Sequence, residues 1–388
     1  MFRALAILVA LAATPALAQV PQGPKNVPEF SPAFKNQTRA PQIRGSQAFS
    51  VTRIASGLEH PWGLAVLPGG GYLVTERTGR LNYVSASGKV TRIGGTPKIV
   101  ARGQGGMLDV AIADDFESTR RVFLTYSKPA GGDQATAAGV GILSADNTRL
   151  SDFRDIFVQS PTVNSGGHFG SRIVVSGPVA YVTIGDRNQD NMPQSLRTTV
   201  GKVVRVSTDG RVPSNNPFVG KGRSRPEIWS YGHRNPQGAA LHPRTGELWT
   251  LEHGPAGGDE LNRIRPGRNY GWPVVSYGED YDGSPIGQGR TSGQDFTEPQ
   301  YYWDPVIAPG DFTFYTGSLF EGWQGDVIAA SLNPGGIVRL KLNGDRVSGE
   351  ARYLQELGRI RDVDVDRDGS LLVLTDDPNG GVFRVVPR

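Results

Sequence analysis

The chain contains no cysteine, and this absence excludes disulfide frameworks, thiolate-bound metals and cysteine nucleophiles. Histidine is scarce as well, with five residues in 388, and no two of them have the spacing of zinc ligands. A zinc centre is therefore not expected. The lack of cysteine fits an exported protein that folds without disulfides.

Long apolar runs are also few. The run at the N-terminus, residues 4–18, is shorter than the roughly 20 residues that a membrane-spanning helix needs. It follows the charged start Met1-Phe2-Arg3 and ends in Ala16-Leu17-Ala18, which is the pattern of a signal peptide. The sequence therefore predicts a signal peptide over residues 1–18, cleaved after Ala18, and a periplasmic or secreted protein with no membrane span.

Charge of one sign is not concentrated in any segment. The formal net charge is +4, without a run of Lys or Arg and without an aromatic stacking motif. Nucleic acid is therefore not an expected partner, and an anionic small ligand explains the positive balance as well. No Rossmann or P-loop pattern follows a strand, which argues against nicotinamide and nucleotide chemistry. Because no long apolar exposed stretch favours a dimer, a monomer is expected.

Glycine and proline are abundant instead. The 52 Gly and 28 Pro are typical of a turn-rich chain with many short strands. Five prolines among the polar residues 19–48 predict a tether or an irregular surface wrap. Beyond it a two-strand pattern recurs in six places: 63–66 with 72–75, 109–112 with 122–125, 172–175 with 180–183, 238–241 with 247–250, 313–315 with 326–329 and 362–365 with 371–374.

Six copies of one unit predict an all-β fold, a six-bladed β-propeller of four-stranded antiparallel blades that forms a single domain over residues 49–388. A β-sandwich is the alternative, but it gives no reason for six copies of the pattern. Clusters of polar residues follow separate strands of these units, and a propeller would bring them together at one mouth.

One cluster is the glycine-rich loop 164–172, which places His168 at the entrance of a strand. A histidine there can reach a ligand, and as a neutral base it can take a proton from an alcohol while hydride leaves the same carbon. The alternative is a loop histidine bonded to the backbone.

A second cluster is Arg234-Asn235 within residues 231–238. A planar guanidinium beside an amide suits a ligand with carboxylates or quinone oxygens, whereas the alternative is an arginine that braces the turn before Pro236. In a third cluster, residues 253–262, kinked backbone is combined with Asp259 and Glu260. Hard oxygen ligands of this kind suit calcium, and the alternative is a solvated acidic turn.

Taken together, the motifs of this chain resemble the soluble quinoprotein sugar dehydrogenases, the glucose/sorbosone dehydrogenase family, and most closely its bacterial aldose sugar dehydrogenase branch. The resemblance extends from about residue 50 to the C-terminus, and it is carried by Gly103-Gln104-Gly105-Gly106, His168 to Arg172, Gly185-Asp186-Arg187, Gly232 to Gly238, Gly254 to Asn262 and Asn269-Tyr270-Gly271-Trp272-Pro273.

The resemblance implies a six-bladed propeller that holds pyrroloquinoline quinone (PQQ) and calcium at its mouth. It also implies that His168 removes the proton of the sugar C1 hydroxyl as hydride moves to the quinone C5 carbon, with Arg234 as the second catalytic residue. Gln104, Arg234 and Asn235 would contact the cofactor, the last two near its reactive oxygens.

Further site residues follow from the same resemblance. Arg359 and Arg361 would pair with the cofactor carboxylates, and Trp303 would lie beside the ring or the sugar. The chain departs from some relatives at Asn333, where they carry a lysine, and at Gly167, where glucose-specific members carry an acidic residue.

Two calcium sites are implied as well. The backbone oxygens of Gly254 and Pro255 would hold a calcium ion at the cofactor, where it polarises the quinone as a Lewis acid. Glu260 and Tyr270, with Asp259 as a further candidate, would hold a structural calcium.

The function expected from the sequence is therefore a quinoprotein dehydrogenase that oxidises aldose sugars at C1 to lactones and passes the electrons to an acceptor such as a cytochrome, a quinone or a dye. A calcium-dependent lactonase is one alternative, but it leaves Arg234, Arg359 and Arg361 without a task because a neutral lactone has no carboxylate. A non-catalytic ligand-binding propeller is the other, favoured by the asparagine at position 333.

Overall fold

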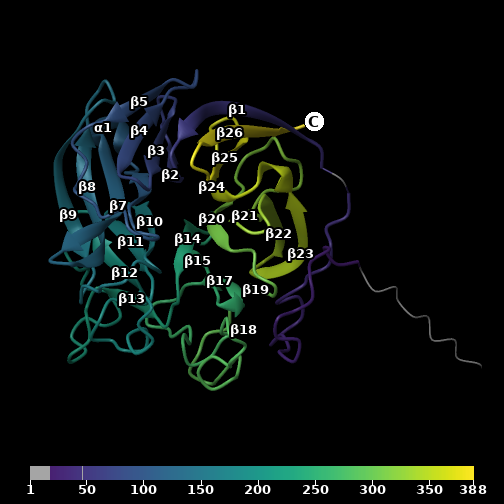
Figure 1. Ribbon diagram of the computed structural model, residues 1–388. Helices are drawn as coiled ribbons and strands as arrows, with labels where there is room; N and C mark the ends of the chain where they lie inside the picture. The colour runs from purple at the N-terminus through teal and green to yellow at the C-terminus, as the bar shows by residue number, and fades with distance from the viewer. Residues whose placement is uncertain (1–17, 46) are drawn as a thin grey trace, which may run out of the picture.

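Six four-stranded antiparallel sheets surround a central axis in the computed structural model, which describes residues 18–45 and 47–388 (Figure 1). We number these blades in chain order. Blades 1 and 2 comprise β2 (Pro61–Val66), β3 (Tyr72–Glu76), β4 (Arg80–Val84) and β5 (Val90–Ile93), then β6 (Met107–Ile112), β7 (Arg121–Ala130), β8 (Asp133–Leu143) and β9 (Leu150–Val158). Blades 3 and 4 comprise β10 (Gly170–Ser176), β11 (Val179–Ile184), β12 (Lys202–Ser207) and β13 (Ile228–Tyr231), then β14 (Pro236–Leu241), β15 (Leu248–Glu252), β17 (Asp259–Arg263) and β19 (Tyr301–Trp303).

Blades 5 and 6 comprise β20 (Pro309–Phe314), β21 (Val327–Ser331), β22 (Ile337–Asn343) and β23 (Arg346–Tyr353), then β24 (Ile360–Val365), β25 (Leu371–Thr375), β26 (Gly380–Pro387) and β1 (Phe49–Leu58). The other elements are β16 (Ala256–Gly257), β18 (Gly278–Glu279), the one-turn helix α1 (Phe116–Thr119) and the 3-10 turn η1 (Gln355–Leu357). The expected six-bladed all-β propeller is thus confirmed, and the six predicted strand pairs are the two innermost strands of the six blades.

Blade 6 joins the two ends of the propeller. Its three inner strands come from the C-terminus, and its outermost strand is β1, which pairs antiparallel with β26 from Phe49 opposite Pro387 to Leu58 opposite Gly380. Figure 1 shows β1 in purple alongside the yellow strands of blade 6. The N-terminal strand is therefore hydrogen-bonded into the C-terminal blade, and the chain continues from it directly into blade 1, which closes the ring.

Hydrophobic contacts between neighbouring blades form the core. The second strands β3, β15, β21 and β25 are buried at every residue, because both faces of each blade lie against another blade. Six apolar clusters each join two adjacent blades; one of them contains Val74 of blade 1 and Leu374 of blade 6. Burial of these faces is the main favourable term in forming the ring.

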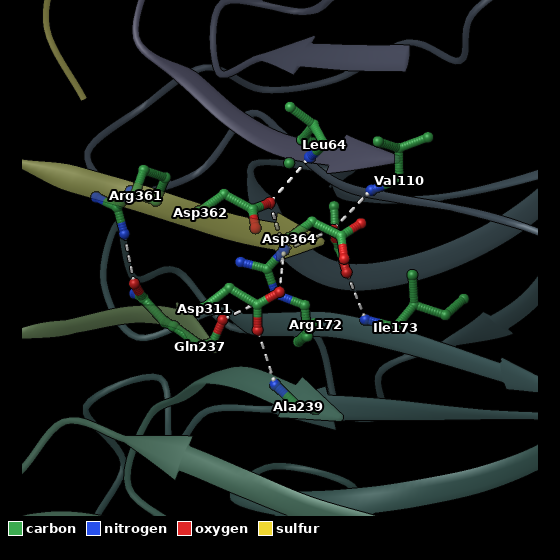
Figure 2. Close-up of polar contacts among 12 residues, drawn as sticks. Leu64, Val110, Arg172, Ile173, Gln237, Ala239, Asp311, Arg361, Asp362 and Asp364 are labelled. Atoms are coloured by element: carbon green, nitrogen blue, oxygen red, sulfur yellow. Dashed lines mark hydrogen bonds and ion pairs between the residues drawn. The ribbon is translucent and has the colours of Figure 1, made fainter. Parts of the chain in front are cut away.

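A buried ionic network lies on the axis, where the inner strands converge (Figure 2). Arg172 Nη1 lies 2.7 Å from Asp109 Oδ1, 3.1 Å from Asp362 Oδ2 and 3.3 Å from Asp311 Oδ2, and its Nε donates to the carbonyl oxygen of Gln237. We call these four side chains the axial cluster.

The carboxylates of the axial cluster also connect blades to one another. They accept hydrogen bonds from the backbone amides of Ile173, Leu64 and Ala239, each of which belongs to a neighbouring blade. Burial raises the pKa of Asp109 to about 6, although Arg172 lowers it in part. All six inner strands are thereby tied at one point beneath the mouth.

The segment before β1 lies against the outer strands of blades 4 and 5. The amides of Asn26 and Val27 donate to the Asp304 carboxylate, Tyr302 donates its amide hydrogen to the Gln37 carbonyl, and Ile43 donates to the Glu350 carbonyl. Gln37 is fully buried. Residues 18–45 therefore follow an irregular path over the surface, with isolated bridges instead of a strand.

The predicted signal peptide, residues 1–18, falls almost entirely outside the described residues, which begin at Ala18. Among residues 18–45 and 47–388, no helix has the length and apolar character needed to cross a membrane.

Candidate active site

The loops that precede the inner strands meet at one end of the axis and surround a cavity of about 250 Å³, which we call the inner mouth cavity. Gln104, His168, Arg234, Asn235, Gly254, Arg359 and Arg361 all line it, so most of the predicted cofactor residues are brought together. It is also lined by residues to which the sequence analysis gave no role: Trp62, Arg77, Gln237, His253, Tyr281, Ala308, Leu332 and Asp376.

A second cavity of about 540 Å³ adjoins the first, and we call it the outer mouth cavity. The two share His168, Arg234 and Tyr281, so His168 stands where they meet. The wall of the outer cavity combines aromatic rings with short polar side chains, among them Trp272, Asn188 and Asp190. This mixture of apolar faces and hydrogen-bonding groups suits a polyhydroxylated ligand.

His168 is fixed by two other loops. Its backbone amide donates to Gln104 Oε1 at 2.8 Å, and its ring Nδ1 lies 2.7 Å from Asp186 Oδ1. Because the carboxylate can only accept, Nδ1 carries the ring proton and Nε2 keeps a free lone pair. The Gly185 position allows this approach, since a Cβ there would lie 2.1 Å from the His168 carbonyl oxygen.

Asp186 is the partner that sequence reasoning missed. It is 1% exposed, and besides His168 it accepts hydrogen bonds from the Asn188 amide and from Trp272 Nε1 at 2.7 Å. The motif Gly185-Asp186-Arg187 could be seen in the sequence, but its pairing with a histidine in another loop depends on the fold. The result is an aspartate–histidine pair held from three sides.

Arg234 is positioned by the kinked segment that follows β15. Its Nη1 donates to the Gly254 carbonyl oxygen at 2.7 Å, and its guanidinium carbon lies 5.2 Å from the centre of the Trp272 ring. Its Nε has no acceptor among the described residues. Next to it, Asn235 Oδ1 accepts the Gly170 amide at 3.0 Å, so this side chain also holds the loop that carries His168.

Arg359 and Arg361 share one carboxylate. Asp376 Oδ2 lies 2.6 Å from Arg361 Nη2 and 3.2 Å from Arg359 Nη2. Although burial opposes it, the charge of Arg361 helps to hold the pKa of Asp376 well below its usual range, whereas burial lowers the pKa of Arg361. Arg361 Nε is buried without an acceptor in the described part of the chain. This side of the cavity therefore carries a positive excess, which suits an anionic ligand.

The predicted calcium residues surround a small cavity of about 20 Å³, enough for a single water or ion. Gly254, Pro255, Glu260 and Tyr270 line it, together with Glu252. Burial raises the pKa of Glu260 well above its usual range, with further contributions from nearby carboxylates. Among residues 18–45 and 47–388 no set of three Asp, Glu or His side chains is arranged to hold a metal ion, so a cation here would depend on backbone oxygens as well.

Asp259 and Trp303 lie elsewhere than the sequence analysis expected. Both oxygens of Asp259 accept backbone amides, from Gly254 and from Ile307 and Ala308, and the residue does not line the small cavity. Trp303 is 1% exposed and packs in the core between blades 4 and 5, so it is not at the mouth. Its strand β19 turns this ring inward, and the tryptophans that line the mouth cavities are Trp62 and Trp272.

This chain is similar to known sugar dehydrogenases over most of its length. The family model described as glucose/sorbosone dehydrogenase matches residues 58–384. The aldose sugar dehydrogenase YliI of Escherichia coli (strain K12) is 41% identical over 345 residues, which cover 87% of this chain and 93% of the relative.

Two solved structures show the same architecture. The soluble aldose sugar dehydrogenase of Escherichia coli in its apo form has a TM-score of 0.85 and 39% identity, covering 88% of this chain and 100% of the other. The PQQ-bound aldose sugar dehydrogenase of Streptomyces coelicolor has a TM-score of 0.72 and 27% identity, covering 88% of this chain and 99% of the other.

Proposed function

The chain belongs to the glucose/sorbosone dehydrogenase family, and on that premise we propose that it is a quinoprotein that oxidises aldoses at C1 to lactones with PQQ as the hydride acceptor. The family match and the dehydrogenase relatives make it an oxidoreductase acting on sugars. The observation that carries the finer proposal is the position of His168, paired with a buried aspartate where the two mouth cavities meet.

The inner mouth cavity fits an anionic quinone. Arg234 and Arg361 line it, and each has a buried Nε without an acceptor in the described residues. Buried polar groups normally find a partner, so these two N–H groups indicate a ligand with acceptor oxygens. In our proposal, Arg359 and Arg361 bind the cofactor carboxylates, and Gln104, Arg234 and Asn235 bind near its quinone oxygens.

PQQ, when bound, supplies a two-electron acceptor for the hydride that leaves the sugar carbon. The protein supplies the proton acceptor. Because Nδ1 of His168 is bonded to Asp186, Nε2 faces ligands with its lone pair and takes the proton of the C1 hydroxyl. The Asp186 carboxylate then stabilises the imidazolium, since it lies 2.7 Å from the ring nitrogen. Arg234 is placed to stabilise negative charge at the reacting end of the cavity.

We propose that calcium binds in two places. The carbonyl oxygens of Gly254 and Pro255 are hard ligands beside the cofactor cavity, although Gly254 already accepts one hydrogen bond from Arg234. Glu260 and an oxygen of Tyr270 are the candidates for a structural ion, with Glu252 nearby. The Tyr270 hydroxyl is hydrogen-bonded to the backbone of Arg263 and Arg265, so the candidate calcium ligand of Tyr270 is its carbonyl oxygen. Asp259 then positions Gly254 instead of binding the ion.

Export is the remaining part of the proposal. The apolar N-terminal run with its small-residue exit supports a signal peptide cleaved after Ala18 and a periplasmic or secreted enzyme. N-terminal sequencing of the protein recovered from the periplasm or medium tests it, with a first residue of Gln19 as the expected result. The electron acceptor, whether cytochrome, quinone or dye, is to be identified by reduction assays.

The test of the catalytic proposal has two steps. Purified protein is titrated with PQQ in the presence of calcium, and aldoses are then added while the quinone absorbance and dye reduction are followed. We expect saturable uptake, followed by reduction that depends on the sugar. His168→Ala should bind PQQ but lose sugar-dependent reduction by roughly 10²–10⁴-fold, the usual contribution of a general base.

His242→Ala is the matched control, because His242 lies against Trp249 and Phe314 in the core and not at the mouth. Activity is normalised to folded protein for both variants. An absence of PQQ uptake at high calcium would overturn the dehydrogenase proposal and favour a binding scaffold. Uptake without aldose oxidation in any tested sugar would overturn the C1 chemistry.

A further inference from the structure

Trp62 is a buried aromatic residue of the inner mouth cavity that the proposed function leaves without a role. It is the second residue of β2, it is 4% exposed, and it packs with Leu108 and Phe169 in a small apolar cluster at the top of the inner strands. The ring nevertheless forms part of the cavity wall.

A fixed cation covers one face of this ring. The guanidinium carbon of Arg172 lies 4.4 Å from the centre of the Trp62 ring. Arg172 lines the cavity that follows the axis below, which is about 280 Å³, whereas Trp62 lines the inner mouth cavity above it. The indole therefore separates the two cavities, with Arg172 on its lower side.

Arg172 itself has little freedom to move. Figure 2 shows its guanidinium among the carboxylates of the axial cluster, which it contacts through Nη1. Its Nε donates to the backbone of Gln237 in the next blade. Because this cation is held from several blades, the Trp62 ring is supported from below by a rigid base.

The polar groups of the inner mouth cavity stand around this ring. The guanidinium carbon of Arg361 lies over the ring at 5.9 Å from its centre, and the contact of Arg361 with Asp376 holds it at the cavity wall. Arg234 and His168 line the same cavity from blades 4 and 3. A planar ligand that lies on the ring would thus meet an apolar surface at its face and the positive charge of Arg361 nearby.

We propose that Trp62 is the platform on which the planar ring system of the quinone cofactor stacks, and that the axial cluster holds this platform in place through Arg172. This inference rests on the proposed function, because it assumes that the inner mouth cavity binds the quinone. It assigns the affinity for the ring system to one residue of this chain, separately from the arginines that bind the carboxylates. Flat aromatic faces in van der Waals contact attract one another beyond the effect of area burial.

The test uses the calcium-loaded, full mature chain without PQQ and measures the dissociation constant for PQQ by absorbance and by quenching of tryptophan fluorescence. Trp62→Leu keeps an apolar side chain of considerable size but removes the aromatic face, and we expect it to weaken PQQ binding by roughly ten- to a hundred-fold. Trp62→Phe keeps a ring over Arg172 and should bind within about three-fold of the wild type. It should also show less quenching, because the fluorophore at the platform is gone.

Trp303→Phe is the matched control, since Trp303 is equally buried but lies in the core between blades 4 and 5. It should keep both the affinity and the quenching of the wild type. Thermal unfolding of each variant without PQQ shows whether the propeller is intact. If Trp62→Leu does not fold, the platform is tested by the loss of quenching in Trp62→Phe.

The outcomes separate this inference from the proposed function. If the wild type does not bind PQQ at all, both the proposed function and this inference are overturned. If the wild type binds but folded Trp62→Leu binds equally well, or Trp62→Phe is quenched as strongly as the wild type, only the platform is overturned.

Discussion

The axial cluster and the mouth are both built from arginine and aspartate, but their charge ratios are opposite. On the axis, one arginine faces three carboxylates, whereas at the mouth Arg359 and Arg361 share Asp376. The axis is completed by the chain itself, because its carboxylates also accept backbone amides from neighbouring blades. The mouth instead leaves a positive excess for a ligand to balance; Nε of Arg234 and of Arg361 has no acceptor among the described residues, although Arg172 Nη2 on the axis also lacks one.

The axial cluster contributes to folding and the mouth to ligand binding, at two levels of the same axis. Burial raises the pKa values of Asp109, Asp311 and Asp362 on the axis, and neighbouring carboxylates raise those of Asp109 and Asp311 further, which is a cost that the interblade contacts offset. At the mouth, burial lowers the pKa of Arg361, whereas the charge of Arg361 lowers the pKa of Asp376 against the opposing effect of burial. Variants at the two levels should therefore affect different measurements.

The largest expected effect on stability is at the axis. Arg172→Leu leaves three buried carboxylates without their cation, and removal of one partner of such a buried set typically costs about 3–5 kcal/mol. We expect the free energy of unfolding in urea to fall by that amount. Arg339→Leu, which breaks a single buried pair with Asp326 away from the axis, is the control and should cost less. Equal losses in the two variants would remove the distinction between the axis and an ordinary buried ion pair.

At the mouth the same kind of change should affect binding instead. Arg361→Met removes the guanidinium proposed to bind a cofactor carboxylate, and hydrogen bonds to charged groups contribute about 1.5–3 kcal/mol. We expect PQQ affinity to fall by roughly ten- to a hundred-fold, with a change in unfolding free energy well below that of Arg172→Leu. Titration of PQQ and urea unfolding are measured on the same sample.

The control for this variant is Arg384→Met, which removes a surface ion pair with Asp368 in the same blade. It should leave both measurements near the wild-type values, because exposed ion pairs contribute little. A stability loss in Arg361→Met as large as at the axis would show that the mouth arginines are needed for folding, which contradicts the comparison.

The pH dependence of stability also differs between the axis and the mouth. Asp364 lines the cavity of about 280 Å³ on the axis, and burial raises its pKa to about 7. The folded chain therefore keeps a proton that the unfolded chain has released above about pH 4. Stability conferred by that proton is present at low pH and is lost as pH rises towards 7. Each such proton corresponds to a slope of about 1.4 kcal/mol per pH unit.

Asp364→Asn should therefore flatten the fall of unfolding free energy between about pH 4 and 7. Urea unfolding across this range measures it, with Glu117→Gln on the exposed side of α1 as the control that keeps the wild-type slope. Asp376→Asn is the opposite case: the depressed pKa of Asp376 contributes stability that is lost as pH falls below about 4, so this variant should change only the acid limb. A wild-type slope in Asp364→Asn would contradict the burial argument.

Local patterns in the sequence were enough to find the inner strands and the loops of the mouth. Each inner pair consists of two apolar strands joined by a short turn. The motifs around Gln104, His168 and Arg234, which supply residues of the inner mouth cavity, lie directly before such pairs. The stretch Asp366-Arg367-Asp368-Gly369 forms the turn between β24 and β25, in which Val365 lies opposite Leu371. These features depend on residues that are close in the chain.

The contacts that could not be foreseen join distant segments. Arg172 meets Asp362 across 190 positions and Asp109 across 63, and no local pattern connects them. Closure of blade 6 by β1 and the pairing of His168 with Asp186 depend in the same way on the completed ring. The family resemblance implied that Trp303 lies beside the cofactor ring or the sugar, but the pairing of β19 with β17 places its ring in the core.

The smallest effect is expected where the mouth meets solvent. Tyr281 is 75% exposed, yet it lines both mouth cavities, on the insertion of blade 4 that follows β18. If its ring covers the sugar over His168, Tyr281→Ala should raise the KM for the preferred aldose by about three- to ten-fold, while kcat, PQQ affinity and unfolding free energy stay unchanged. Val219→Ala, at another exposed apolar residue away from the mouth, is the control. A loss of PQQ affinity in Tyr281→Ala would place this ring against the cofactor instead, and an unchanged KM would show that the Tyr281 ring does not cover the sugar.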